Sequence, residues 1–424
     1  MDIKSKLARL DKSKPELTVS PLKTIPDDDW MRECEYELRA AIIQEKNSFI
    51  VLKERTYPLQ SFPFMSDFMN CQGIIPNFHQ LSGTHPVENF DLQHTLFIDL
   101  ETSGIAGGSG TFAFLVGLGH LEWDHIVVRQ YLLPDFQYEW LLLKHVENSF
   151  VSFKNLATYN GKSFDIPLLR NRFVLNRMDT QIDQLCHIDF LHLARRIWKR
   201  RLAGCDLKNL EYVILGKERN RDIPGELIPQ IYFEYIRKRK AALLEQVFEH
   251  NFYDVCHMIL LAIQIGLIVS DPFKYLHHEE DLFSIARYYY RRHLYEAAQP
   301  IFQQLLEFTQ NPQLKIESLF FLSMLHKHRR QYQQSSELFH QLLATQKDHA
   351  TAIEELAKYY EHKEKNYQAA LELVNKALDH INLLEQLGKE SSLLAYKNSL
   401  HHRRDRLERR KYSYRHHLTN EDGD

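Results

Sequence analysis

Two carboxylates that could share a cation stand two residues apart in an apolar segment. Asp99 and Glu101 lie in HTLFIDLE (94–101), whose apolar and β-branched residues predict a strand. Side chains two residues apart on a strand project from the same face, so both carboxylates would point the same way. Like charges side by side repel each other, and burial in such a strand adds to the cost. A bound metal ion would relieve both penalties.

Two more carboxylates follow in separate segments. Asp165 comes after the strand-and-turn pattern NLATYNG (155–161), at a strand end, where α/β sheets place their sites. Asp254 lies in an apolar helical pattern, with His250 one turn earlier on the same face. Each has a purely structural alternative. Asp165 could be a helix N-cap, and Asp254 could form a local hydrogen-bonded pair with His250.

Taken together, the four carboxylates predict metal-dependent hydrolysis. Hard oxygen ligands in this number suit Mg²⁺ or Mn²⁺. Two such ions about 4 Å apart can activate a water and stabilise the leaving oxygen of a phosphodiester. His250, beside the last aspartate, would be the general base for that water.

The strand and helix patterns around these residues predict an α/β domain. Strand patterns at 111–123 and 125–133 follow the strand of Asp99, which predicts an antiparallel meander. A helix, a strand and another helix come next, which predicts a mixed central sheet flanked by helices. Those three elements are expected at 138–150, 155–160 and 164–175, with further helices at 30–44, 189–201, 206–214 and 241–268.

Beyond a break at Ser270-Asp271-Pro272 the chain reads as helical throughout. The segments 294–306, 331–343 and 366–378 align without gaps, and each carries an aromatic, a small and several large apolar residues at fixed offsets. Their tyrosines are Tyr295, Tyr332 and Tyr367, and their small residues are Ala298, Ser335 and Ala370. The pattern resembles tetratricopeptide (TPR) repeats, which would bind a protein partner. An ordinary helical bundle is the alternative.

Three motifs of this sequence resemble those of a known superfamily. FIDLETSG (97–104), YNGKSFDIPLL (159–169) and HNFYDV (250–255) are similar to motifs I, II and III of the DEDD 3′–5′ exonucleases, the DnaQ-like branch of the ribonuclease-H fold. The run 94–268 more closely resembles the YprB-type ribonuclease-H-like proteins of bacteria. The segments 188–202, 207–211 and 221–236 also resemble that family.

The resemblance implies a fold, a ligand set and an activity. It implies a ribonuclease-H-like domain in which Asp99, Glu101, Asp165 and Asp254 hold two Mg²⁺ or Mn²⁺ ions. One position departs from the DEDD pattern, which has His five residues or Tyr four residues before the last aspartate. Here Glu249 and His250 occupy those two positions, so a histidine stands at the tyrosine spacing, and the identity of the general base stays open.

Basic residues near these motifs are candidates for nucleic-acid contacts. Arg195, Arg196, Lys199 and Arg200 form pairs one turn apart on a predicted helix, a stripe that could hold phosphates without reading sequence. A solvated helix face is the alternative. Asn160 and Lys162 of the second motif are further candidates. The arginine-rich segment 401–417 reads as a polar cap, or as a second nucleic-acid contact.

Composition narrows the class of protein. The 424 residues carry 53 Lys+Arg against 56 Asp+Glu, a net charge of −3, which argues against a polybasic binder but not against local basic surfaces. Hydrophobic residues at 44% argue against wholesale disorder.

Five scattered cysteines without CxxC predict neither a zinc ribbon nor a disulfide framework, and favour a cytoplasmic protein. The longest apolar run, 258–269, is too short for a membrane span.

We therefore expect three parts: an N-terminal extension (1–90), a ribonuclease-H-like nuclease domain (91–270), and, after a linker (271–281), TPR-like repeats with a basic capping helix (282–412) and a polar tail (413–424). The expected activity is 3′–5′ exonucleolytic cleavage of DNA or RNA. Two alternatives remain at this stage. One is an inactive nuclease fold that binds partners through the repeats, and the other is a structure-selective endonuclease with the same ligands.

Overall fold

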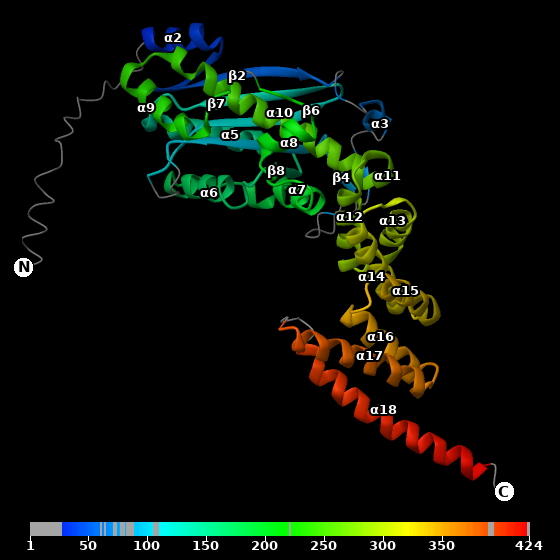
Figure 1. The fold of residues 1–424 in the computed structure, drawn as a ribbon. Helices are drawn as coiled ribbons and strands as arrows, with labels where there is room; N and C mark the ends of the chain where they lie inside the picture. The colour runs from blue at the N-terminus through cyan, green and yellow to red at the C-terminus, as the bar shows by residue number, and fades with distance from the viewer. Residues whose placement is uncertain are drawn as a thin grey trace, which may run out of the picture. The chain divides into compact units, whose positions relative to one another are not determined.

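The fold divides into two compact units, each built from segments that are separate in the sequence (Figure 1). A computed structural model describes residues 28–59, 62, 65–70, 74–76, 81, 89–104, 110–219, 222–388 and 394–421. The first unit comprises Met1–Ser61, Gln93–Ile188 and Glu218–Ile259, and the second comprises Phe62–Leu92, Asp189–Lys217 and Leu260–Asp424.

The first unit is a mixed sheet covered by helices. Its strands are β1 (Ala41–Glu45), β2 (Ser48–Pro58), β5 (Thr95–Thr102), β6 (Ala113–Glu122), β7 (His125–Leu132), β8 (Asn155–Thr158) and β9 (Cys186–Asp189). Its helices are α2 (Asp28–Leu38), α5 (Glu139–Phe150), α6 (Asp165–Leu175), α9 (Ile228–Lys238) and the first part of α10 (Glu245–Ser270). Short 3₁₀ turns are η2 (Phe136–Tyr138), η3 (Ile182–Gln184), η4 (Gly225–Leu227) and η5 (Ala241–Leu244).

The sheet confirms the predicted fold class. Among the described residues it has seven strands in the order β1-β2-β7-β6-β5-β8-β9. Strands β5, β6 and β7 form the expected antiparallel meander, and β8 pairs in parallel with β5 after the crossover helix α5. The strand β5 that carries Asp99 and Glu101 therefore lies inside the sheet, with a neighbour on each side.

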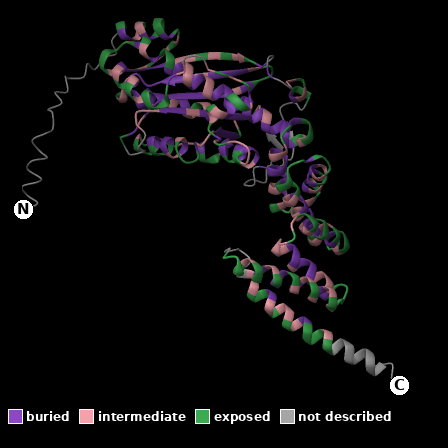
Figure 2. Cartoon of the chain, viewed as in Figure 1, coloured by how far each residue is buried: buried purple, intermediate pink, exposed green. Residues whose placement is uncertain are grey.

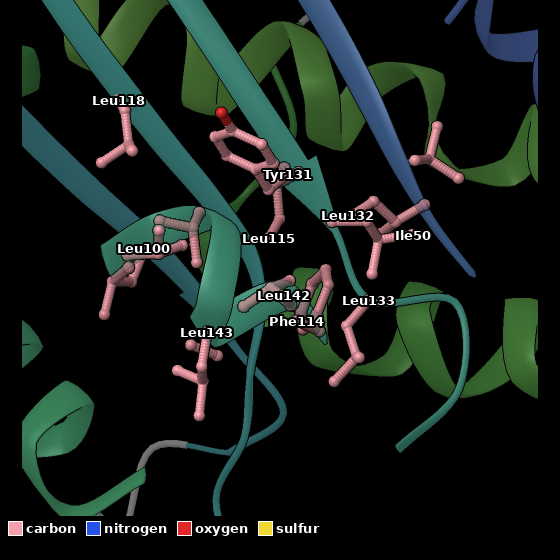
Figure 3. Close-up of a cluster of buried hydrophobic side chains, with 14 of the residues drawn as sticks. Ile50, Leu100, Phe114, Leu115, Leu118, Tyr131, Leu132, Leu133, Leu142 and Leu143 are labelled. Carbon is pink, nitrogen blue, oxygen red and sulfur yellow. The ribbon is translucent and has the colours of Figure 1, made fainter. Parts of the chain in front are cut away.

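One face of this sheet packs against α5 to form the main core. Side chains of β5, β6 and β7 meet leucines of α5 there, and Tyr131 stacks on His145 of α5 with ring centroids 6.3 Å apart. Figure 3 draws Leu100, Leu118 and Tyr131 of the strands and Leu142 and Leu143 of the helix, which belong to this one buried cluster. Figure 2 shows the buried residues gathered along these strands and α10.

The start of the domain and one N-terminal helix differ from expectation. The predicted helix at 30–44 ends at Leu38, and Ala41–Glu45 is the edge strand β1, paired with β2. Arg39 has φ 49°, a left-handed conformation that ends the helix. Residues 41–58 thus supply two strands of the sheet, although the sequence analysis placed 1–90 outside the nuclease domain. Local patterns miss this because β2 pairs with β7, whose residues are distant in the sequence.

The second unit is helical. It contains α3 (Met65–Asn70), a two-stranded ribbon of β3 (Ile74–Pro76) and β4 (Asn89–Asp91), α7 (Phe190–Trp198), α8 (Leu207–Val213), the end of α10, α11 (Pro272–Tyr275) and α12 (Glu279–Arg291). Its remaining helices are α13 (Tyr295–Phe308), α14 (Pro312–His328), α15 (Tyr332–Thr345), α16 (Ala350–His362), α17 (Tyr367–Gln386) and α18 (Leu394–Glu421). Consecutive helices from α12 to α18 contact each other.

The aligned segments occupy equivalent places in this helical region. The three repeat tyrosines are the first residues of α13, α15 and α17, and the small residues Ala298, Ser335 and Ala370 are buried. Membership of the TPR family and binding of a protein partner stay predictions. The expected linker 271–281 contains α11 and the start of α12, and α18 continues to Glu421 through most of the expected polar tail.

Within the described residues, one helical stretch is long and apolar enough to cross a membrane by length and composition alone. It spans Ala241–Ser270, and 83% of its most apolar window is buried inside the protein. Burial of this kind is typical of the core helix of a soluble fold.

The arginines of α18 have a structural partner. Glu361 of α16 has no exposed side-chain surface, and three arginines surround its carboxylate: Arg403 at 2.9 Å, Arg406 at 2.7 Å and Arg410 at 3.1 Å. A buried carboxylate requires such partners. These contacts support the interpretation of the basic helix as a cap on the repeats.

We expect Glu361→Ala to destabilise the C-terminal hairpins by about 2–3 kcal/mol, because it leaves Arg403 half-buried without this partner. Hydrogen exchange of α18 and denaturant unfolding measure the effect. The exposed Glu408→Ala on the same helix is the control, with an expected change of about 0.5 kcal/mol or less. Equal protection of α18 in both variants would show that the cluster contributes nothing.

Candidate metal centre

The site is built on three residues that lie side by side across the sheet. Asp99 of β5 is opposite Gly117 of β6, and Gly117 is opposite Gln130 of β7. Their side chains share the face opposite to that packed on α5, because register neighbours point the same way. Helix α10 crosses this face (Figure 1).

Gly117 is the point where α10 comes closest to the sheet. A Cβ atom at Gly117 would lie 2.3 Å from Oδ1 of Asn251, so no larger residue fits without displacing the helix. Asn251 fills this gap and is buried. Its Nδ2 donates to Oδ2 of Asp99 at 2.8 Å, and its Oδ1 accepts from Nε2 of Gln130 at 2.8 Å. The amide therefore fixes both the helix and the first carboxylate.

The approach of α10 brings the predicted histidine and last aspartate to the strand. Glu101, His250 and Asp254 each offer a ligand atom, and these atoms all lie within 4.8 Å of one another. Nε2 of His250 lies 3.4 Å from Oδ2 of Asp254. The local His–Asp contact considered in the sequence analysis thus exists, but it lies beside a third titratable group from a distant strand.

Asp165 comes from the turn that follows β8. It is the first residue of α6, whose N-cap is Phe164, so the N-cap alternative does not hold. Asn160 adopts a left-handed φ of 63° in this turn. A Cβ atom at the next residue, Gly161, would lie 2.7 Å from Oδ2 of Asp165. The predicted Gly turn therefore folds back closely against the carboxylate.

Two charged residues that the sequence analysis did not single out complete the site. Arg219 forms an ion pair with Oδ1 of Asp254, and its Nη1 donates to the carbonyl oxygen of His250 at 3.3 Å. Asp222 lies 2.7 Å from Nδ1 of His250 through its Oδ1. The side chains of Arg219 and Asp222 are only 5% and 6% exposed. Both belong to the segment that leads into α9.

The electrostatics of the carboxylates favour a cation. Burial raises the pKa of Asp99 well above the usual carboxylate range, and the charges of Asp254 and Asp165 raise it further. Burial likewise raises the pKa of Glu101, followed by the charge of Asp99. The positive charge of Arg219 opposes both shifts without reversing them. Ionising these carboxylates together is therefore unfavourable unless a further positive charge is present.

The donor set fits a hard divalent cation. Four carboxylates from β5, α6 and α10 act on one another electrostatically, and Glu101 is buried. Mg²⁺ and Mn²⁺ prefer such oxygen ligands. The number and identity of the ions stay predictions.

Glu249 and Tyr253, the neighbours of His250 on this turn of α10, contact other residues. Glu249 forms an ion pair with Arg55 of β2. Tyr253 packs against the rings of Phe252 and His257, with centroids 5.4 and 5.5 Å away. Of Glu249, His250 and Tyr253, His250 is the one whose ring lies beside Glu101 and Asp254.

The predicted phosphate-binding stripe begins on α7 of the second unit and runs past its end, since α7 ends at Trp198 and Lys199 and Arg200 follow it. The stripe is partly paired. Arg200 forms ion pairs with Glu280 and with Glu317, the latter at 2.7 Å, and Arg196 donates to the carbonyl of Leu81. Arg195 and Lys199 are exposed, as is Lys162 in the first unit. Pairing gives Arg196 and Arg200 a structural role, and nucleic-acid binding by the basic residues stays a prediction.

Comparison with known proteins agrees with this geometry. A model of the RNase_H superfamily matches residues 96–265, which include Asp99 and Glu101 of β5, the turn before α6 and the site turn of α10. The chain is also 30% identical over 429 residues to the uncharacterized protein YprB of Bacillus subtilis (strain 168), covering 97% of this chain and all of that protein.

The chain belongs to the YprB family. The RNase H-like match covers most of the first unit together with α7, α8 and part of α10, and the helical region from α12 to α18 follows it. The superfamily suggests a nuclease that acts on nucleic acid with divalent metal.

Three residues of the site, Asn251, Asp222 and Arg219, were not predicted from the sequence, although two of them lie in segments that the sequence analysis named. Asn251 lies within the third motif, between His250 and Asp254, but its role depends on Gly117. Asp222 lies in the segment 221–236 that resembles the family, and Arg219 lies just before it. Nothing in their local spacing shows that they reach α10.

We expect the metal-free protein to lose stability as pH rises. The raised pKa values of Asp99 and Glu101 mean that these groups bind protons more tightly in the folded state than in the unfolded state. Proton binding therefore stabilises the fold at low pH, and this stabilisation is lost as pH rises through the pKa values of the folded state. Melting temperatures from about pH 5 to pH 8 in EDTA measure it. Asp99→Asn should flatten the dependence, and Mg²⁺ should restore stability at the upper end.

The exposed Asp179→Asn is the control and should follow the wild type. Parallel pH curves for wild type and Asp99→Asn would contradict the electrostatic description of the site.

Proposed function

We propose that this protein is a metal-dependent nuclease that hydrolyses phosphodiester bonds of nucleic acid, and specifically a 3′–5′ exonuclease. The observation that carries the proposal is the convergence of Glu101, His250 and Asp254 within 4.8 Å, beside a second carboxylate on the same strand. The match to the RNase_H superfamily over the same residues supports it. The DEDD-like motifs support the exonuclease assignment.

In this proposal Asp99, Glu101, Asp165 and Asp254 would hold the divalent metal, which supplies Lewis-acid activation of water and stabilisation of the leaving oxygen when bound. The protein's own part is to orient the groups around it. Asn251 fixes the Asp99 carboxylate through its amide. These ligands come from rigid strand and helix positions, so little reorganisation accompanies binding.

His250 is held as a proton acceptor by Asp222. When Nδ1 donates its proton to Asp222 at 2.7 Å, Nε2 is left unprotonated and faces the carboxylates. An unprotonated Nε2 at this position can accept the proton of the attacking water. Asp222 acts through the histidine and is a positioning residue.

We expect full-length protein with Mg²⁺ or Mn²⁺ to degrade labelled single-stranded DNA or RNA, and Asp99→Asn to lower the rate by roughly 100-fold or more, because one carboxylate carries several kcal/mol of metal-dependent stabilisation. Asp179→Asn should keep wild-type activity. Negligible cleavage of every substrate by the wild type would favour the inactive scaffold instead.

The products distinguish the two nuclease alternatives. We expect an exonuclease to release mononucleotides from a 3′-labelled strand from the earliest time points, and a 3′-phosphate block to prevent this. Internal fragments from a 5′-labelled, 3′-blocked strand would instead indicate a structure-selective endonuclease.

We expect Asp222→Asn to lower turnover roughly 10–100-fold with a smaller change in KM, because the amide no longer sets the tautomer of His250. The same substitution in a His250→Ala background should have little further effect, since Asp222 acts through that ring. Additive losses in the double variant would show that Asp222 has a separate role.

A further inference from the structure

We propose that the helical unit holds a binding site for one free nucleoside 5′-monophosphate, in a cavity between α14, α15 and α16. The cavity has a volume of about 210 Å³. All of its lining residues belong to the second unit, whereas the metal centre is built from residues of the first unit. The site is therefore separate from the proposed nuclease function and does not depend on it.

The space for a ligand follows from the sequence of the middle repeat. Ser336 of α15 stands where the other two aligned segments have Gln299 and Leu371. The middle repeat thus has a much smaller side chain at this position. Ser336 lines the cavity together with Phe339 of the same helix. A larger side chain at position 336 would fill part of it.

The hydroxyl groups of Ser335 and Ser336 are available to a ligand. Both residues line the cavity, and they are only 4% and 7% exposed. Among the described residues neither hydroxyl has a hydrogen-bond partner, whereas that of Ser323 on α14 donates to the carbonyl oxygen of Leu319 at 2.6 Å. Buried polar groups are rarely left without partners. A hydroxyl both donates and accepts, so this pair can bond to the edge of any base.

Aromatic rings form the walls of the cavity. Tyr332, Phe339 and Tyr359 line it, with Phe339 buried and the two tyrosines half-buried. Nucleic-acid bases stack on aromatic rings whatever their sequence. The cavity is smaller than the roughly 300 Å³ or more that drug-sized ligands occupy, so it suits one base, with the ribose and phosphate at its mouth.

Two lysines beside the cavity keep donors for a phosphate. Lys327 and Lys358 both line it, and its one lining carboxylate, Glu355, pairs with both of them, with Lys358 at 2.9 Å. Lys358 also pairs with Glu354 at 2.8 Å. Each ammonium group has three donors, so each lysine can still donate to a further acceptor.

A third lysine adds a positive charge that no described carboxylate balances. Nζ of Lys363 lies 3.9 Å from the centre of the Tyr332 ring, and Lys363 has no ion pair among the described residues. Three lysines against one glutamate leave the lining positive. A phosphate monoester carries a charge of about −1.5 to −2 near pH 7, which complements this lining.

Acidic residues next to the cavity favour a single nucleotide over a strand. Glu364 raises the pKa of Tyr359 through a hydrogen bond, and the charge of Glu337 raises it further. These carboxylates therefore lie close to a lining residue. They would repel the additional phosphates of a nucleic-acid strand, whereas one phosphate can stay beside the lysines.

The test measures binding of AMP to the full-length protein by isothermal titration calorimetry in EDTA, which keeps divalent ions out of the metal centre. We expect one AMP to bind per chain. Adenosine and inorganic phosphate should each bind at least roughly tenfold more weakly, because each makes only part of the contacts. UMP should bind within about tenfold of AMP, because the serine hydroxyls accept either base.

Three variants locate the site. Ser336→Leu introduces the residue that the last repeat has at this position and should weaken AMP binding roughly tenfold or more, because it fills the cavity. Ser335→Ala removes one hydroxyl and should weaken binding about 3–10-fold. Lys363→Gln removes a charge and should weaken it about tenfold. Lys347→Gln alters an exposed lysine that does not line the cavity, and should bind AMP as the wild type does.

Hydrogen exchange gives a second measurement. AMP should slow exchange in α15 and α16 of the wild type but not of Ser336→Leu. Equal AMP binding by wild type and Ser336→Leu, or inorganic phosphate binding as tightly as AMP, would overturn the proposal. A 5′-phosphorylated oligonucleotide that binds more tightly than AMP would overturn the assignment to a free nucleotide. If circular dichroism shows that Ser336→Leu does not fold, Ser335→Ala and Lys363→Gln still decide.

The result is distinguishable from the outcome for the nuclease. Asp99→Asn should bind AMP in EDTA as the wild type does, because the cavity does not use the metal centre. Loss of AMP binding in folded Asp99→Asn would place the nucleotide at the metal centre and overturn the proposal. Absence of AMP binding to the wild type would also overturn it, and would leave the nuclease proposal standing.

Discussion

The approach of α10 to the sheet at Gly117 is the constraint on which the centre depends. A glycine in the middle of a buried strand has no side chain to pack, and here that absence admits Asn251 of the helix. The amide then links the helix to Asp99 on one strand and to Gln130 on another. At Gly119 a Cβ atom would lie 2.2 Å from Val255, so the close contact continues along the helix. Everything that α10 contributes to the site follows from this contact.

Charge compensation is the second organising constraint. Burial of Asp99 and Glu101 on an inner strand is unfavourable without cations, as their raised pKa values show. Among the described residues, the fold brings the guanidinium of Arg219 to these carboxylates, and the repulsion that remains favours a bound metal ion. Carboxylates with strongly shifted pKa values are common at binding sites, where the arrangement serves a ligand and lowers the stability of the protein without it. Arg219 and Asp222, which lie just before η4, therefore matter as much to the centre as the residues of the three motifs.

Arginines in the helical unit show how charge patterns can mislead. The basic stripe at 195–200 looks in sequence like a phosphate-binding surface, yet Arg200 forms ion pairs with Glu280 of α12 and Glu317 of α14. On α18, Arg403 and its neighbours surround the buried Glu361. A one-turn spacing shows which residues share a helix face. It does not show which residues that face contacts, because those residues lie elsewhere in the chain. Net charge therefore says little about which basic residues are available to nucleic acid.

The sequence by itself determined the elements whose signals are local. Strand alternation placed Asp99 and Glu101 on one face, the turn at Gly161 preceded Asp165, and the helical period placed His250 beside Asp254. These follow from backbone geometry within a few residues. Only the tertiary structure decided that β1 and β2 join the sheet and that Arg219 reaches Asp254. Those contacts join residues far apart in the chain, and they depend on strand register and helix packing, which no local period encodes.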